Sequence, residues 1–93
     1  MNTTEHLLVC LAEECAEVQQ AVAKALRFGL QGGINTTNAE EIAREVSDLM
    51  AVLQLLEGRG IIEQSHNVEA IEQKKSRVVK YMEHAKTKGT LID

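Results

Sequence analysis

The sequence predicts an all-α fold with three main helices, and the composition, the turn residues and the hydrophobic spacing each support that prediction. The 93 residues include no proline or tryptophan and only one tyrosine and one phenylalanine. Helix formers such as Ala, Leu, Glu and Gln therefore dominate, and strand-favouring residues are few. Turn-forming residues gather in two places, at 28–38 and 58–60. The segments between them carry apolar residues at the spacing of amphipathic helices.

The first helix is expected from about Thr4 to Arg27. Thr3 or Thr4 is the expected N-cap, and Gly29 is a plausible C-terminal stop. The apolar stripe of this helix comprises Leu8, Leu11, Cys15, Val18, Val22 and Leu26.

The second helix is expected to start after Thr37 or Asn38 and to end near Glu57. Thr37 with Glu40, or Asn38 with Glu41, would form a capping box. Its apolar stripe comprises Ile42, Val46, Leu49, Leu53 and Leu56.

The third helix is expected to start after Ser65, with Asn67 as the rival cap, and to end before Gly89. Its apolar stripe comprises Val68, Ile71, Val78, Met82 and Ala85.

Three such helices with so few large side chains make a thin core. We therefore expect a single domain over residues 1–93 that forms a four-helix-bundle-type module completed by homo-oligomerisation. The net charge of −4 and the pI of about 5.3 argue against binding to nucleic acid or to an anionic membrane. No apolar run approaches the ~20 residues of a membrane span, and no signal-peptide pattern precedes the first helix, so a cytoplasmic protein is expected.

Four carboxylates fall in or beside the apolar stripes. On a helical wheel, Glu14 lies within about 60° of five apolar residues, namely Leu7, Leu11, Val18, Ala21 and Ala25. Glu45 takes the same position on the second helix, among Ile42, Leu49, Val52 and Leu56. Glu17 and Asp48 follow these two acids by three residues each, at the edge of the stripe.

Such an arrangement favours a divalent cation. Burying carboxylates costs several kcal/mol per ion unless the charge is compensated, and the four acids would also repel one another. Carboxylates spaced i, i+3 on two helices can converge on one or two ions. Mg²⁺ takes oxygen ligands and is often shared with substrate phosphates, which points to phosphate chemistry, with Mn²⁺ as a substitute ion.

Basic residues of the third helix supply the opposite charge. Lys75 lies within the apolar stripe, four residues after Ile71 and three before Val78, and Lys74 and Arg77 flank it. We expect these three side chains to pair with the acids or to hold a substrate phosphate. The alternative is that they only cover the surface of the bundle.

Over about residues 7 to 57, the sequence resembles the MazG-like all-α nucleoside triphosphate pyrophosphohydrolases. The family signature, Glu-Glu-x-x-Glu followed after a spacer by Glu-x-x-Asp, reads here Glu13-Glu14-Cys15-Ala16-Glu17 and Glu45-Val46-Ser47-Asp48. The resemblance implies a Mg²⁺-dependent enzyme that cleaves a ribo- or deoxynucleoside triphosphate between the α- and β-phosphates into monophosphate and pyrophosphate. It implies metal ligation by Glu14, Glu17, Glu45 and Asp48. It also implies catalytic roles for Glu13, Glu14 and Glu17, of which Glu13 would orient or deprotonate the attacking water.

The resemblance has one departure, and two alternatives stay open. The segment 73–77, QKKSR, only approximates the Lys-Asn-x-x-Arg motif that many family members carry. A phosphoribosyl-ATP pyrophosphohydrolase is the alternative within the superfamily, disfavoured by the long loop after the first helix. A non-catalytic oligomerisation or regulatory module is the alternative from another class. The sequence specifies neither the base nor the sugar of the substrate.

Overall fold

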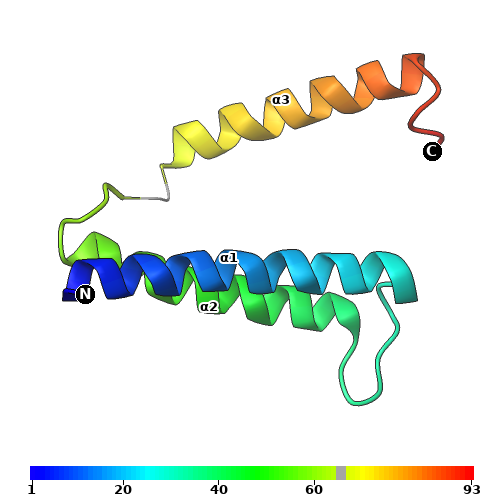
Figure 1. The fold of residues 1–93 in the computed structure, drawn as a ribbon. Coiled ribbons are helices and arrows are strands. Elements are labelled where there is room, and N and C mark those ends of the chain that lie inside the picture. Colours follow the sequence, from blue (N-terminus) through cyan, green and yellow to red (C-terminus); the bar gives the residue numbers. More distant parts are fainter. Residues whose placement is uncertain (65–66) are drawn as a thin grey trace. The chain divides into compact units, whose positions relative to one another are not determined.

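The computed structural model describes residues 1–64 and 67–93, which contain three α-helices (Figure 1). These are α1 (Thr3–Phe28), α2 (Asn38–Gly58) and α3 (Val68–Thr87). No strand occurs in the described ranges, so the all-α prediction is confirmed. None of the described helices has the length and apolar character needed to cross a membrane. The chain divides into two compact units, Met1–Glu63 and Gln64–Asp93.

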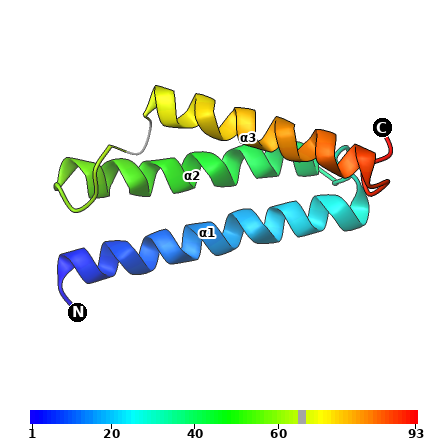
Figure 2. The ribbon, with the colours of Figure 1, turned by 90° about the horizontal axis from the view of Figure 1, so that it is seen from above.

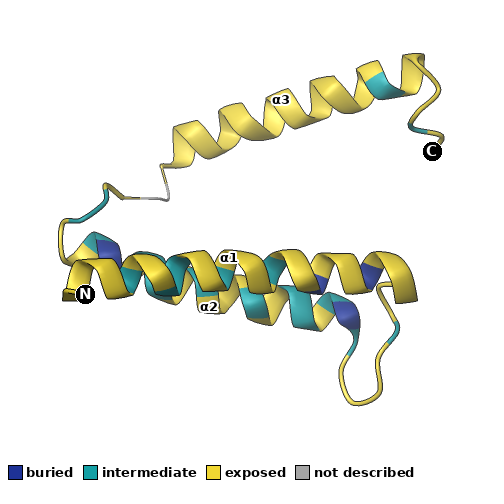
Figure 3. Cartoon of the chain, in the orientation of Figure 1, coloured by how far each residue is buried: buried dark blue, intermediate teal, exposed yellow. Residues whose placement is uncertain are grey.

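In the first unit, α1 and α2 pack side by side and run antiparallel, as both views show (Figures 1 and 2). Ala21 and Ala25 are the buried residues of α1, and Leu56 is fully buried on α2 (Figure 3). Alanine at two successive turns lets the helix backbones approach closely, because it adds little volume between them.

The buried line of α1 differs in part from the stripe predicted for it. The side chains that the structure buries or half-buries are centred on Glu14 and include Leu7, Leu11 and Val18. The other members of the predicted stripe are exposed, namely Leu8, Cys15, Val22 and Leu26. The apolar residues of α1 thus form two adjacent lines, of which one packs within the first unit.

Three polar side chains cap the helices. Asn2 caps α1, since its Oδ1 accepts from the backbone N–H of Glu5 at 2.8 Å, so the prediction of Thr3 or Thr4 was wrong. Thr37 caps α2 as predicted, and its hydroxyl oxygen accepts from the N–H of Glu40 at 3.1 Å.

Asn67 caps α3 and accepts from the N–H of Ala70 at 2.9 Å, which confirms the rival cap. The other expected cap, Ser65, lies outside the described residues.

The connection between α1 and α2 is fixed by Asn38, which is 2% exposed. Its side-chain amide donates to the carbonyl oxygen of Gly29 at 2.8 Å, and its backbone N–H donates to that of Gly32 at 2.8 Å. Gly33 has φ +130°, and a Cβ at this position would collide with the carbonyl oxygen of Thr36. The tight loop therefore requires glycine at 33 and sets where α2 begins beside the end of α1.

In the second unit, α3 is a single helix in which every residue except Ala85 is exposed. Its surface carries two i, i+3 ion pairs, Lys75 with Glu72 at 3.0 Å and Lys86 with Glu83 at 3.7 Å. The apolar residues predicted to form its stripe include Val68, which is 73% exposed.

Candidate functional site

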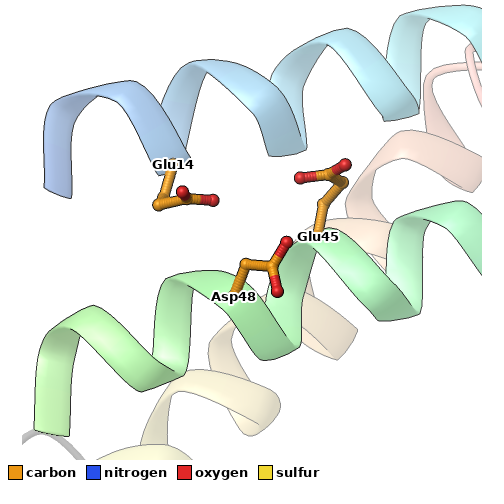
Figure 4. A group of neighbouring side chains, drawn as sticks. All are labelled: Glu14, Glu45 and Asp48. Carbon is orange, nitrogen blue, oxygen red and sulfur yellow. The ribbon is translucent and has the colours of Figure 1, made fainter. Parts of the chain in front are cut away.

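Three of the predicted acids meet between α1 and α2. One carboxylate oxygen from each of Glu14, Glu45 and Asp48 lies within 4.8 Å of the other two. Figure 4 shows Glu14 extending from α1 toward α2, while Glu45 and Asp48 extend from α2 into the same space. The antiparallel packing thus joins acids that are 31 and 34 positions apart in the sequence.

The position of each acid follows from its helix. Glu14 lies midway along the buried line of α1 and is itself half-buried. Glu45 is nearly as enclosed, with a side chain 12% exposed, whereas Asp48 lies one turn further along α2 and is exposed. Two carboxylates are therefore held at the helix interface, and the third faces both them and solvent.

The cluster disfavours full ionisation. Partial burial, followed by the negative charges of Asp48 and Glu45, raises the pKa of Glu14 above its ordinary value of 4.5. The charges of Glu17 and Glu13 act in the same direction. Without a cation, Glu14 therefore holds its proton more tightly than an isolated glutamate does.

The donor set suits a hard divalent cation. It consists entirely of carboxylate oxygens, which Mg²⁺ and Mn²⁺ prefer over nitrogen or sulfur. In an octahedron with bonds of about 2.1 Å, ligand oxygens lie about 3 to 4.2 Å apart. The limit of 4.8 Å among the three oxygens is within 1 Å of that range, so small side-chain rotations would bring them around one ion.

The other two predicted acids lie beside this cluster. Glu17 lies one turn after Glu14 on α1 and lines a hollow next to the cluster. Glu13 is exposed on α1. The structure thus groups Glu14, Glu45 and Asp48 as close neighbours and leaves Glu13 and Glu17 at the periphery.

The basic residues predicted to hold phosphate are all exposed on α3, in the second unit. The ammonium group of Lys75 pairs with Glu72, one turn earlier on the same helix, and both side chains are mostly exposed. The assignment of Lys74, Lys75 and Arg77 to substrate phosphate stays a prediction.

A second set of cations, not predicted from the sequence, lies in the first unit. A hollow of about 270 Å³ between α1 and α2 is lined by three basic residues, Lys24, Arg27 and Arg44, and by three acids, Glu17, Glu41 and Glu45. Because Glu45 belongs to both, the hollow adjoins the acid cluster. The sequence does contain a sign of this set. Lys24 follows Glu17 by seven residues and Arg27 follows Lys24 by three, so both continue the face of α1 that carries Glu17.

Comparisons of the chain with protein-family models, with curated proteins and with solved structures find no match.

Proposed function

We propose that this protein is a MazG-like nucleotide pyrophosphohydrolase that uses Mg²⁺, or Mn²⁺ in its place, to cleave a ribo- or deoxynucleoside triphosphate between the α- and β-phosphates. One observation carries the proposal: two halves of an acidic motif, on different helices, come together as Glu14, Glu45 and Asp48 with their oxygens within 4.8 Å. An acidic cluster alone does not identify a reaction. The pyrophosphohydrolase reaction is proposed because the acids follow the family's motif order, Glu13-Glu14-x-x-Glu17 and then Glu45-x-x-Asp48. Such an enzyme would work in the cytoplasm, where its substrates are made.

In the proposed reaction, a water oxygen attacks the α-phosphorus. A new P–O bond forms on the side opposite the bridging oxygen to the β-phosphate, and that bridging bond breaks. Glu13 accepts the proton that the water loses. The electron pair of the broken bond leaves with pyrophosphate, and the nucleoside monophosphate remains.

The carboxylates of Glu14, Glu17, Glu45 and Asp48 would hold the metal in this scheme. A bound divalent cation supplies charge neutralisation on the phosphate oxygens and polarisation of the α-phosphorus. The protein contributes position, because its acids sit on two packed helices rather than on loops.

We also propose that copies of the chain associate as a homodimer or homotetramer. Apolar side chains of the first unit stay exposed along α1 and α2, among them Leu26 at 83%, Met50 at 49% and Val22 at 40%. Covering these side chains in an oligomer removes apolar area from water, which stabilises the oligomer by roughly 25 cal/mol per Å² of that area. Sedimentation equilibrium showing one 10.3-kDa species at micromolar concentration would contradict this proposal.

The experiment that tests the function is pyrophosphate release from a panel of ribo- and deoxynucleoside triphosphates, with and without Mg²⁺. We expect turnover of at least one member only when the metal is present. Glu45→Gln and Asp48→Asn should each lower kcat by at least about 100-fold, because each removes a charged metal ligand. Both variants should retain the helical circular-dichroism spectrum of the wild type.

Glu63→Gln is the matched control, since it removes the same charge from an exposed position beyond the end of α2. It should retain wild-type turnover. If no triphosphate is cleaved, phosphoribosyl-ATP is the next substrate to assay. Failure with that substrate too, in a protein that folds, would favour the non-catalytic module over the enzyme.

A further inference from the structure

The hollow beside the acid cluster brings together most of the basic side chains of the first unit, with three acids, Glu17, Glu41 and Glu45, in the same lining. That unit, Met1–Glu63, has four Lys and Arg residues, and three of them line the hollow. They are Lys24 and Arg27 from the last turns of α1 and Arg44 from the first half of α2. An otherwise acidic helix pair thus gathers its cations in one place, next to Glu45.

Two of these cations are now paired with acids of α2. The ammonium Nζ of Lys24 lies 3.5 Å from Oε2 of Glu41, and the guanidinium Nη2 of Arg44 lies 3.1 Å from Oε1 of Glu45. Both basic side chains are substantially exposed, at 46% and 62%. The Lys24–Glu41 pair, in which both side chains are at least 30% exposed, is weak, so a more highly charged anion can displace the Glu41 carboxylate. The acid of the other pair, Glu45, is only 12% exposed.

Glu45 links the hollow to the cluster. Its carboxylate is the counter-ion of Arg44 and also one of the three grouped oxygens. With a divalent cation on that carboxylate, Arg44 would lose part of its negative partner. Its planar guanidinium could then donate two hydrogen bonds to a phosphate, an anion that its geometry suits.

We infer that Lys24, Arg27 and Arg44 form the subsite for the β- and γ-phosphates, the part of the substrate that leaves as pyrophosphate. This inference rests on the proposed function, because it takes the acid cluster as the place where the α-phosphate is attacked. It gives the substrate a direction: the pyrophosphate end points toward the α1–α2 loop. Lys24 follows Glu17 by seven residues, about 10.5 Å along the helix axis, a separation that an extended lysine side chain and a triphosphate together span.

The test uses inorganic pyrophosphate as the probe, with Mg²⁺ present, and compares four variants of the full chain with the wild type. Lys24→Gln should weaken pyrophosphate binding about tenfold and raise KM by a similar factor, since a charge-assisted hydrogen bond to a dianion is lost. A Lys24→Gln/Arg27→Gln double variant should weaken binding further. Both should bind Mn²⁺ as the wild type does, because neither residue belongs to the acid cluster.

Lys86→Gln is the matched control. Lys86 is paired with a glutamate and is 44% exposed, close to the 46% of Lys24, and it should leave pyrophosphate binding unchanged. Lys75→Gln tests the rival assignment on α3. Weakened binding in Lys75→Gln with unchanged binding in the Lys24 and Arg27 variants would overturn the subsite.

The two proposals fail in different ways. Metal-dependent hydrolysis by the wild type, with unaltered pyrophosphate affinity in the Lys24 and Lys24/Arg27 variants, would overturn the proposed subsite. The proposed enzymatic function would still stand. If the wild type neither binds Mn²⁺ nor hydrolyses a triphosphate, the proposed enzymatic function is wrong. The subsite would then be judged by pyrophosphate binding alone, where a loss in Lys24→Gln supports it, and no binding to the wild type overturns it.

Discussion

At the scale of single residues, the most informative side chain is Glu14. A charged group at the centre of a buried apolar line lowers the stability of the helix pair unless something compensates its charge. Here the neighbouring acids add repulsion to partial burial, and both raise its pKa. The ionised carboxylate of Glu14 therefore lowers the stability of the helix pair when no cation is bound.

Replacing Glu14 by glutamine should stabilise the metal-free protein at pH 7. Because its pKa is raised in the folded state, the folded protein binds this proton more tightly than the unfolded chain does, and ionisation lowers the stability. That penalty is fully present when the pH is above the raised pKa, and it is absent when the pH is below about 4.5, the ordinary pKa. Thermal unfolding in EDTA should show a higher Tm for Glu14→Gln at pH 7 and no difference from wild type below about pH 4.

Glu63→Gln again serves as the control, since this exposed acid lies beyond the helix pair. Its Tm should follow that of the wild type across the same pH range. A Glu14→Gln variant that melts at or below the wild-type temperature at pH 7 would show that the Glu14 charge is already compensated in the metal-free protein.

The grouping of Glu14, Glu45 and Asp48 could be predicted from their phase on the helical wheel, because a side chain within an apolar stripe must face whatever covers that stripe. The role of Lys24, Arg27 and Arg44 could not. Periodicity places a basic residue on a face, but only the packed helix pair shows that cations from α1 and α2 line one hollow.

At the scale of elements, the α1–α2 hairpin positions the site, and its loop sets the alignment of the two helices. Asn38 is the buried polar residue that joins them, through its side-chain bond to Gly29 and its backbone bond to Gly32. The sequence marked Thr37 and Asn38 as equal candidates for the cap. Both contribute, Thr37 as the cap and Asn38 as the link back to the end of α1.

Replacing Asn38 by alanine should lower the free energy of unfolding by about 1 kcal/mol, because one hydrogen bond from a buried amide to the Gly29 carbonyl is lost. Urea unfolding followed by circular dichroism measures this change. Asn35→Ala is the matched control, since Asn35 lies exposed in the same loop. Equal midpoints for the two variants would show that the Asn38 side chain does not fix the hairpin.

The helix bounds of α2 were predictable to within a residue or two because a capping residue and a glycine mark its ends. The start of α1 was also predicted to within one residue, at about Thr4 against Thr3, but its N-cap was not, although Asn2 and Glu5 have the spacing of a capping box. Threonine at two later positions offered the same local chemistry, and only the backbone shows that the helix includes them. The two apolar lines of α1 were merged for a similar reason, since residues one position apart lie on neighbouring faces.

At the scale of the whole molecule, the sequence and the structure agree on a small all-α protein with more apolar surface than its helix pair covers. The charge is unevenly distributed: the first unit holds the acid cluster and, sharing Glu45 with it, a hollow that three basic and three acidic side chains line. Under the proposed function, a metal-bound triphosphate would bring a cation to the cluster and phosphates to the basic side chains. The reaction assigned to this surface depends on the motif order, which makes the position of bond cleavage the claim to test.

The most direct test is hydrolysis of a nucleoside triphosphate with Mg²⁺ in ¹⁸O-labelled water, followed by phosphorus NMR of the products. We expect monophosphate and pyrophosphate in equal amounts, with the label in the monophosphate, because water attacks the α-phosphorus in the proposed reaction. Label in inorganic phosphate or in pyrophosphate, or release of nucleoside diphosphate, would contradict it.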